Sequence, residues 1–346
     1  MATPEQAGVN RAPLPSAGGS LSAVEVVAAA CAAATGPVAV TGATGWFGAV
    51  ALDLLYEALG DDAPGLVTAY ASREHRVAVA DGRVVDVRPL AELPDAAESP
   101  SVLLHFAYLT RDKVAQLGTA EYIAANVAIT ATVIDAIAVH RPKAVVMTSS
   151  GAVYGGAPGR LSANLGDPYG ALKRLDELSF RAAVRDVGGT CVIPRVFSVA
   201  GPRMTKPELY AMGSMIAMAA VGGPIVVQAE RPVFRAYCGV DEVVALAFWA
   251  ATHGGDLVFD SGGAVVEMGA LAQAVARVQG LDEASVVRIW DPDGPPSRYV
   301  GDPASMEAIA MDAGLPLASL EDLIARTAQW LRRSSDSALQ AASPPL

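Results

Sequence analysis

The sequence predicts a doubly wound α/β fold, in which helices cover both faces of a parallel sheet, followed by a smaller C-terminal domain. From residue 37 onward, short apolar runs typical of strands alternate with helix-length segments. Several runs are apolar throughout, as expected for strands that are buried on both faces. A length of 346 residues suits one large α/β unit or two modest domains and allows a sizeable core.

The composition indicates a globular chain whose partners are small molecules. Hydrophobic residues make up 52% of the sequence and charged residues 18%, which is typical of a protein with a large core. The formal net charge is −11. Nucleic-acid binding needs clustered lysine and arginine, so we expect no nucleic-acid partner. A few local arginines still suffice to hold an anionic small ligand.

The cysteines and histidines predict neither a metal site nor a disulfide framework. The three cysteines, Cys31, Cys191 and Cys238, lie far apart and form no CxxC pair. The four histidines show no ligand spacing relative to them. Cysteines of this kind fit a reducing compartment, and we therefore expect a cytoplasmic protein.

The first 36 residues are expected to form a tail and a short helix. Residues 1–20 are rich in Ala, Pro, Gly and Ser, and residues 21–35 carry apolar side chains at helical spacing. This apolar stretch follows no basic region and is shorter than the ~20 residues that span a bilayer, so we expect no membrane segment. A helix docked on the body of the protein is the plainer interpretation, and a helix serving a dimer contact is the alternative.

The alternation of elements divides the rest of the chain into two domains and a tail. Strands are predicted at PVAVTG, LVTAYAS, VVDV, SVLLHFA, AVVMTSS, TCVIPRVF and LVFDSG, and helices at 46–59, 119–140 and 169–187. Residues 37–200 are predicted to form the main α/β domain, to which a strand near 257–260 returns. Pro and Gly then interrupt the pattern, so 201–332 is predicted to be mainly the smaller domain and 333–346 a flexible tail.

A glycine-rich turn joins the first predicted strand to the helix that follows. The segment GATGWFG, residues 42–48, has the spacing GxxGxxG. Glycines let the backbone approach a pyrophosphate closely, and the helix N-terminus supplies free N–H groups and the positive end of a dipole. The turn therefore predicts a dinucleotide site on a Rossmann-type sheet, with these candidate cofactor contacts: Gly42, Thr44, Gly45, Trp46, Phe47 and Gly48.

The end of the second predicted strand bears on which dinucleotide is bound. An acidic residue there favours NAD, whereas an arginine accommodates the 2′-phosphate of NADP. The strand ends at Ser72 and Arg73, and no aspartate stands at this point. A hydroxyl beside a guanidinium is a good phosphate clamp, so the sequence favours NADP, with NAD as the alternative.

A tyrosine and a lysine form the candidate reaction centre. Tyr169 and Lys173 fall at the start of a predicted helix, where positions i and i+4 share one face. A phenol with a pKa near ~10 is a poor base at neutral pH, and a neighbouring ammonium lowers the cost of the phenolate. Such a tyrosine can exchange a proton with a substrate oxygen while hydride moves at a nicotinamide. The hydroxyl of Ser150, at the end of the fifth strand, can bind the same oxygen.

The chain resembles a known family through four features in order: the glycine turn, SSGAVYG, YGALK and IPRVFSVAGPR. They are similar to those of extended short-chain dehydrogenases/reductases of the NAD(P)-dependent nucleotide-sugar epimerase/dehydratase family, from about residue 37 to about residue 332. The resemblance makes Ser150 the catalytic hydroxyl, Tyr169 the acid/base and Lys173 the residue that also holds the nicotinamide ribose. Asn126 matches the helix asparagine that supports this lysine through water. The resemblance also implies a homodimer, because such enzymes often pair through a four-helix contact.

The remaining cofactor contacts implied by the resemblance lie along the strands. They are Asp86 and Val87 toward the adenine, and Phe106, Ala107, Pro194 and Val196 along the dinucleotide.

On the substrate side, two arginines match phosphate-binding positions of the family. PVFRAYCGVDEVV is similar to its R-D-F-I-H-V-D-D-V segment and contains Arg235, and PPSRYVGDP is similar to its RPGD stretch and contains Arg298. Two arginines in one cleft attract a diphosphate even in an acidic protein. With Ser150 and Ser198 they are the candidate contacts to a nucleotide-sugar-like substrate, which makes the smaller domain the substrate-binding one.

Two departures from the family pattern narrow the chemistry. The Thr-Asp-Glu of family dehydratases is replaced by Ser150-Gly151-Ala152, so the acid that eliminates water is missing and 4,6-dehydration is not expected. Ser198 stands where sugar-nucleotide epimerases usually carry asparagine, which removes an amide that faces the substrate.

Three functions follow from these residues. An NADPH-dependent ketoreductase is favoured by Ser72 and Arg73. A nucleotide-sugar epimerase that keeps NAD bound is the alternative. A non-catalytic nucleotide-binding protein is the remote alternative, because a binding protein does not need a serine, tyrosine and lysine at these positions.

Overall fold

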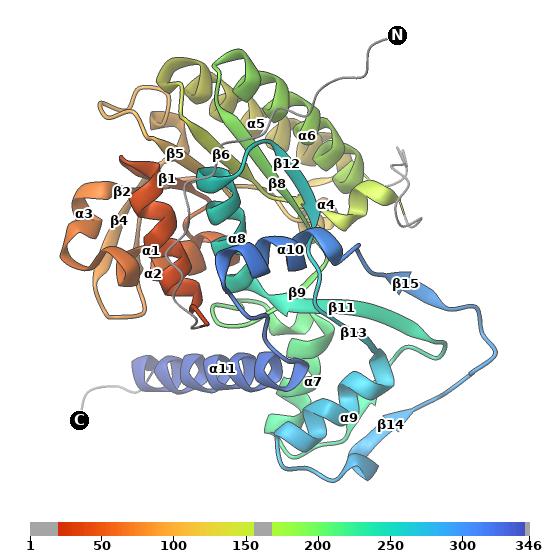
Figure 1. The fold of residues 1–346 in the computed structure, drawn as a ribbon. Coiled ribbons are helices and arrows are strands. Elements are labelled where there is room, and N and C mark those ends of the chain that lie inside the picture. The colour runs from red at the N-terminus through yellow and green to blue at the C-terminus, as the bar shows by residue number, and fades with distance from the viewer. Residues whose placement is uncertain (1–19, 156–167, 343–346) are drawn as a thin grey trace.

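The computed structural model describes residues 20–155 and 168–342. Most of the tail predicted over 1–20, much of the segment between Ser150 and Tyr169, and residues 343–346 lie outside the described residues. A large unit of sheet and helices fills the upper half of Figure 1, and a smaller group of helices and strands lies below it.

A nine-stranded sheet forms the centre of the upper unit. Its strands are β1 Val38–Thr41, β2 Val67–Ala71, β3 His75–Ala78, β4 Val84–Pro89, β5 Val102–His105, β6 Ala144–Met147, β7 Ser149–Ser150, β8 Thr190–Val196 and β12 Leu257–Asp260. The order is β12-β8-β6-β5-β1-β2-β4-β3, with β7 paired to β8. Every pair is parallel except β3 with β4. The predicted doubly wound parallel sheet is confirmed.

The strand sequences account for this sheet, with one exception at its edge. β1, β5 and β6 are buried at every position, as expected for strands covered on both faces. β3 was not predicted, because its residues are mostly exposed and give no apolar signal. It forms a hairpin with β4, in which Arg76 and Asp86 pair at 3.2 Å.

Helices cover both faces of the sheet (Figure 1). α5 Thr119–His140 and α6 Pro168–Asp186 lie on one face, and α1 Ala23–Ala34, α2 Trp46–Leu59 and α8 Val240–His253 cover the other. The predicted helices 46–59 and 119–140 agree with α2 and α5, and 169–187 agrees with α6 to within one residue at each end. Two short helices, α3 Ala63–Leu66 and α4 Val114–Leu117, lie in the connections.

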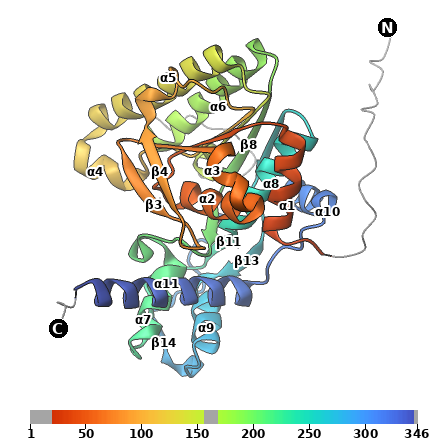
Figure 2. The ribbon, with the colours of Figure 1, turned by 90° about the vertical axis from the view of Figure 1, so that its left-hand side faces the viewer.

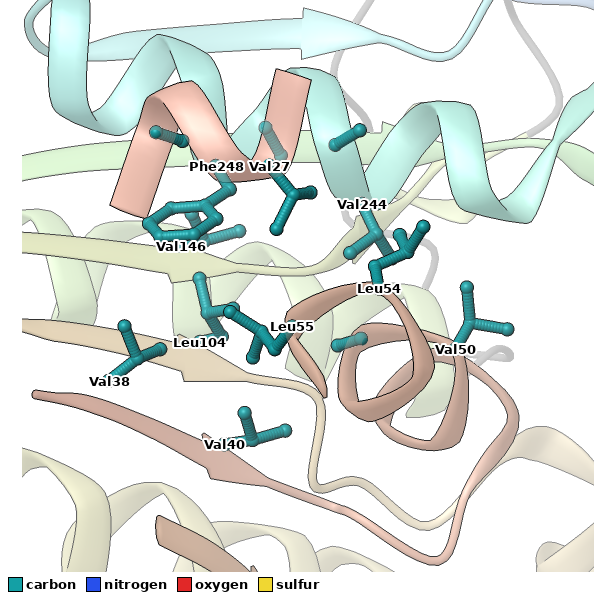
Figure 3. Packing of buried hydrophobic residues seen from close by; sticks show 14 of the residues in the cluster. Val27, Val38, Val40, Val50, Leu54, Leu55, Leu104, Val146, Val244 and Phe248 are labelled. Atoms are coloured by element: carbon teal, nitrogen blue, oxygen red, sulfur yellow. The ribbon is translucent and has the colours of Figure 1, made fainter. Parts of the chain in front are cut away.

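A single core joins α1, α2 and α8 to the sheet, as Figure 3 shows. Val27 of α1 and Phe248 of α8 lie above Leu55 of α2, and all three are at most 1% exposed. Burial of side chains of this size contributes roughly 1.5–3 kcal/mol each. The core therefore holds β1, and with it the glycine turn that follows β1, in a fixed place.

The lower unit has its own core and two small sheets. Its helices are α7 Ala211–Ala220, α9 Met268–Val278 and α11 Leu320–Ala342, and its strands are β9 Ser198–Ala200, β10 Ile225–Val227, β11 Val233–Gly239, β13 Ala264–Glu267, β14 Val286–Arg288 and β15 Ser297–Tyr299. β11 pairs with β13, β15 and β9, while β10 pairs with β14. Buried residues of α7, α9 and α11 pack together, and Figure 2 shows α11 lying across this unit.

The structure corrects two sequence predictions about the C-terminal part. From the part after residue 200, only a strand near 257–260 was expected to return to the main domain. Two helices, α8 and α10 Ala304–Ala313, also pack into the core of that domain. The sequence of an apolar helix shows that the helix is buried, but not which sheet it packs against. The tail predicted from residue 333 is wrong up to Ala342, because α11 continues to that residue, and its last five residues, ALQAA, favour a helix.

Candidate active site

The glycine turn presents backbone instead of side chains at the carboxyl end of β1. Gly42 has φ +72°, in the left-handed region that favours glycine. A Cβ on Gly42 would lie 2.6 Å from the backbone N of Ala107, and one on Gly48 would lie 2.2 Å from the carbonyl of Gly42. Gly45 caps α2 without a side-chain hydrogen bond, so the N–H groups of its first turn are available to a ligand. This arrangement is a cradle for a pyrophosphate.

Trp46 ties this turn to the lower unit. Its Nε1 donates to the carbonyl of Pro202 at 2.6 Å, and its ring meets the ring of Tyr210 edge-on with centroids 5.0 Å apart. Phe47 packs beside Phe106, with centroids 5.9 Å apart. The cradle is therefore fixed relative to the segment that follows β9.

A cavity of about 420 Å³, here called the cofactor cavity, runs from this turn along the carboxyl edge of the sheet. The glycine turn, the end of β6, the start of α6 and the segment 196–210 line it. The predicted cofactor contacts that it brings together are Gly42, Thr44, Gly45, Trp46, Phe47, Gly48, Phe106, Tyr169, Lys173 and Val196.

Several predicted cofactor contacts lie outside this cavity. Ser72 and Arg73 are exposed directly after β2, at the carboxyl end that also carries the glycine turn. Asp86 is exposed in the first half of β4, and Val87 points into the core. Pro194 is buried within β8.

The structure therefore does not bring Asp86, Val87 or Pro194 to the cofactor cavity. β4 continues to Pro89, so the carboxyl end of this strand lies three residues beyond Asp86. The aspartate pairs with β3 instead. Pro194 pairs with Phe259 of β12 in the interior of the sheet.

Ser150, Tyr169 and Lys173 meet where the cofactor cavity adjoins a second cavity. Ser150 and Tyr169 line both cavities. The Oγ of Ser150 also lies 3.3 Å from the hydroxyl of Tyr299, which reaches the site from β15. Lys173 lies one turn further along α6 and donates from Nζ to the carbonyl of Thr148 at 2.9 Å.

Burial controls the protonation of this pair. Burial raises the pKa of Tyr169 to about 12, while the hydrogen bond with Ser150 and the charge of Arg111 act in the opposite direction. Burial lowers the pKa of Lys173 to about 8, against the charges of Asp176 and Glu177. Desolvation thus outweighs the effects of Ser150 and Arg111, and the charge expected to make the phenol more acidic does not dominate here. Tyr169 is in its neutral, proton-donating form at neutral pH.

Asn126 is buried on α5, but it contacts backbone and not the lysine. Its Oδ1 accepts from the N–H of Leu109 at 2.9 Å, and its Nδ2 donates to the carbonyl of Tyr122 at 3.2 Å. These hydrogen bonds support the loop that follows β5 directly.

That loop carries two residues at the reaction centre that the sequence analysis missed. The ring centroid of Tyr108 lies 3.4 Å from Nζ of Lys173. The guanidinium of Arg111 lies 5.4 Å from the ring centroid of Tyr169. Their position just beyond the carboxyl end of a central strand was the signal that could have found them.

A buried polar network supports the strand ends behind the reaction centre. The carboxylate of Glu177 accepts from Nε of Arg195 at 2.7 Å and from Oγ of Ser149 at 2.7 Å. Arg195 also donates to the hydroxyl of Tyr154, which donates to Asp260 at 2.7 Å. The network fixes α6 relative to β7, β8 and β12, and thus the candidate tyrosine relative to the candidate serine.

The second cavity, of about 800 Å³, is here called the substrate cavity. Ser150, Ser198, Arg235 and Arg298 all line it, as the sequence predicted for substrate contacts, and Arg231 lines it as well. β11 and β15 are parallel neighbours with Phe234 beside Arg298, which places the two predicted arginines on adjacent strands. The arginines give this cavity a positive charge in an acidic protein.

Acidic groups are scarce in both cavities. Of the described residues that line them, Asp112 is the single carboxylate, and it binds Lys206 at 2.7 Å. Within residues 20–155 and 168–342, no group of three or more His, Cys, Asp and Glu side chains is placed to hold a metal ion.

Comparison with known proteins gives a family and a fold. The model of the NAD-dependent epimerase/dehydratase family matches residues 38–259. A search of curated proteins gave no match.

Solved structures with the same fold include nucleotide-sugar enzymes. The UDP-N-acetylglucosamine 4-epimerase from Methanobrevibacter ruminantium is 21% identical with a TM-score of 0.69, over 86% of this chain and 99% of that chain. A double mutant of the dTDP-glucose 4,6-dehydratase from Streptomyces venezuelae, solved with NAD, is 22% identical with a TM-score of 0.66, over 87% and 98%. The UDP-glucose 4-epimerase from Thermus thermophilus, also with NAD, is 21% identical with a TM-score of 0.66, over 86% and 99%. Identities this low establish the fold alone.

Proposed function

The chain belongs to the NAD-dependent epimerase/dehydratase family, and from this premise we propose that it reduces a carbonyl group of a nucleotide-sugar-like substrate with NADPH. It is an enzyme of the extended short-chain dehydrogenase/reductase kind, as its family is. The observation that carries the proposal is the meeting of Ser150, Tyr169 and Lys173 between a cofactor cavity and a substrate cavity.

The residues of the cofactor cavity fit a nicotinamide dinucleotide. Gly42 and Gly48 lie too close to neighbouring backbone to carry side chains, so the turn stays tight, and the N–H groups at the start of α2 are available to a pyrophosphate. Lys173 uses one N–H for Thr148 and has others with which to hold a ribose. A bound nicotinamide supplies or accepts the hydride.

The protonation of Tyr169 favours reduction. Its pKa of about 12 makes it a neutral phenol, which is the form that donates a proton to a carbonyl oxygen as that oxygen becomes a hydroxyl. Ser150 lines the same two cavities as Tyr169 and is placed to donate to the same oxygen. The two side chains thus orient a carbonyl and supply its proton.

Two exposed residues support NADP as the cofactor. Ser72 and Arg73 follow β2 at the carboxyl end of the sheet, where the adenosine ribose of a dinucleotide is expected. A guanidinium there pairs with a 2′-phosphate. A soluble cofactor that leaves after each turnover suits a net reduction.

The arginines support a phosphorylated substrate, and the scarcity of acids argues against dehydration. Arg231, Arg235 and Arg298 line one cavity, whose charge suits a diphosphate. Elimination of water needs a general acid beside the reacting carbon. The one described carboxylate that lines the cavities, Asp112, is engaged with Lys206.

A second candidate is a nucleotide-sugar epimerase that retains NAD. It is favoured by the contacts that cross the cofactor cavity, namely the Asp112–Lys206 ion pair and the hydrogen bond from Trp46 to Pro202. Such contacts slow the exchange of a bound dinucleotide. An epimerase needs retention, because the same cofactor must return the hydride that it takes.

The two candidates differ in cofactor content and in net turnover. The purified protein would be analysed for bound dinucleotide, and then incubated with NADPH and UDP-4-keto-6-deoxyglucose as a ketone probe. We expect little bound NAD and a loss of NADPH absorbance that Ser150→Ala abolishes. Protein that carries NAD and interconverts UDP-glucose and UDP-galactose without net cofactor use is an epimerase. Binding of cofactor with no turnover in either assay would favour the non-catalytic alternative.

Cofactor preference has its own test. Arg73→Glu is expected to weaken NADPH binding at least tenfold, because it replaces the phosphate-binding cation with a like charge. Arg76→Glu, on exposed β3, is the matched control. A wild-type preference for NADH would overturn the assignment of NADP.

We propose further that α5 and α6 form a homodimer contact. Both helices present apolar side chains to solvent, with Val127 46%, Leu175 51% and Leu178 52% exposed. α5 is apolar and long enough, by length and composition alone, to cross a membrane, but its other side packs on α6 and the sheet. A second copy of this surface would bury the apolar stripe of both helices.

The molar mass of the protein, measured by light scattering as it elutes from a size-exclusion column, tests the dimer. Wild type is expected at twice the chain mass, and Leu175→Glu with Leu178→Glu at the mass of one chain. Val221→Glu, which is also exposed but lies on the lower unit, is the control. A monomeric wild type would overturn the dimer, and binding to lipid vesicles would point to a membrane instead.

A further inference from the structure

Tyr108 lies against both members of the candidate tyrosine–lysine pair. It follows β5 in the loop held by Asn126 and lines the cofactor cavity. Nζ of Lys173 lies 3.4 Å from its ring centroid. The ring of Tyr169 meets it edge-on at 75°, with centroids 5.9 Å apart. One aromatic ring from a loop thus contacts two residues one helical turn apart.

The surroundings of Lys173 show what this ring supplies. Lys173 is 5% exposed, and its ammonium donates a hydrogen bond to the carbonyl of Thr148. The carboxylates of Asp176 and Glu177, from its own helix, act on it through their charge. On the β5 side it faces His105, which is uncharged at neutral pH because burial lowers its pKa to about 3. The ring covers a buried cation without adding a proton acceptor.

We propose that Tyr108 is a positioning residue, whose ring holds the Lys173 ammonium in its charged form and packs Tyr169 beside it. This inference rests on the proposed function in taking these two residues as the reaction centre. A cation over an aromatic face is attracted by the ring quadrupole. The attraction uses no N–H group of the lysine, so those not bonded to Thr148 stay available for a ribose.

The role belongs to the ring and not to the hydroxyl. Burial, and then the charge of Asp176, raise the pKa of the Tyr108 hydroxyl, so it stays neutral. Tyr108→Phe keeps the aromatic face and is the conservative control. Tyr108→Leu keeps apolar volume but removes the quadrupole. Loss of the cation–π attraction is expected to lower the pKa of Lys173 by about one unit from its value near 8.

The lysine can be titrated directly, without substrate. The chain has four lysines, Lys113, Lys143, Lys173 and Lys206, so ¹³Cε-lysine labelling of the full chain gives few signals, and Lys173→Met assigns the relevant one. The chemical shift would be followed against pH in wild type, Tyr108→Phe and Tyr108→Leu. Tyr108→Met serves in place of Tyr108→Leu if the latter does not fold, as judged by circular dichroism.

The expected result is a Lys173 midpoint that falls by about one pH unit in Tyr108→Leu or Tyr108→Met and stays near the wild-type value in Tyr108→Phe. An unchanged midpoint, or a rise toward that of an exposed lysine, in the aliphatic variants would overturn the proposal, because burial alone would then set the pKa. An equal shift in Tyr108→Phe would also overturn it. NADPH and NADH titrations on the same samples separate the outcomes, since failure of wild type to bind either cofactor contradicts the proposed function and leaves the lysine result standing.

Discussion

The ammonium of Lys206 binds the carboxylate of Asp112 at 2.7 Å, and both residues line the cofactor cavity although 94 residues separate them in the sequence. Asp112 belongs to the loop after β5, and Lys206 to the segment after β9. Trp46 makes a second contact between the two units through Pro202. Because the ion pair lines the cofactor cavity, we expect it to slow the release of a dinucleotide bound there.

Breaking this ion pair is expected to speed cofactor release. The pair is partly exposed, at 42% and 23% of the two side chains, so we expect about 0.5–1 kcal/mol, or a two- to fivefold faster dissociation, in Lys206→Met. Stopped-flow displacement of NADPH measures the rate. Lys113→Met is the control, because Lys113 lies beside Asp112 in the loop after β5 but is bonded to Gln116. If Lys206→Met and the control release the cofactor at equal rates, the pair does not restrain it.

Removal of the Tyr169 hydroxyl is expected to stop turnover but not cofactor binding. Positioned proton transfer contributes roughly 10²–10⁴-fold, so Tyr169→Phe should lower kcat by at least that range on any carbonyl substrate that wild type reduces. Tyr210→Phe, which removes another hydroxyl from the same two cavities, is the matched control. Cofactor affinity is measured by fluorescence titration. Activity retained by Tyr169→Phe would remove this residue from the reaction.

Much of this site follows from the sequence because its parts are local. The bounds of α2 are set by the glycine turn and by apolar periodicity, and Tyr169 and Lys173 lie one turn apart on one helix. Buried parallel strands are likewise visible as apolar runs. A central sheet and the residues at its carboxyl end can therefore be predicted from short windows of sequence.

The rest depends on contacts between distant segments. Tyr108 lies 65 residues before Lys173, and nothing local marks its ring as the partner of that ammonium. At Asp86, a matching motif predicted an adenine contact, whereas the length of β4 and its pairing with β3 turn the carboxylate toward Arg76. Register and hairpin pairing are properties of the whole sheet.

The buried histidine at the end of β5 predicts acid sensitivity. Burial, and then the charge of Lys173, lower the pKa of His105 to about 3, whereas an unfolded histidine titrates near ~6.5. Below pH ~6.5 the unfolded chain therefore binds a proton that the folded chain does not. The free energy of unfolding then decreases as the pH is lowered, until about pH 3. The loss is on the order of 2–3 kcal/mol at pH ~4.5.

Urea unfolding at several pH values checks this contribution. His105→Asn removes the titrating group and can keep a hydrogen bond to Thr41, whose Oγ1 lies 2.7 Å from the imidazole. Its free energy of unfolding should fall less steeply with acid than that of wild type. His75→Asn, exposed on β3, should keep the wild-type slope. Identical slopes in all three proteins would mean that other groups cause the acid sensitivity.

The Arg203–Asp53 ion pair is expected to stabilise the junction of the two units. Arg203, after β9, binds Asp53 of α2 through Nε and Nη2 at 2.7 and 2.6 Å, and only 16% and 15% of the two side chains are exposed. Arg203→Met leaves a largely buried carboxylate with the N–H of Ala80 as its remaining described donor, so we expect a loss of about 2–4 kcal/mol in the free energy of unfolding. Arg203→Met with Asp53→Leu should lose less than the single variant, because no unpaired charge remains.

Arg76→Met breaks a pair whose side chains are 74% and 86% exposed and should change little. Equal losses in Arg203→Met and Arg76→Met would show that the burial of the pair adds nothing to its strength.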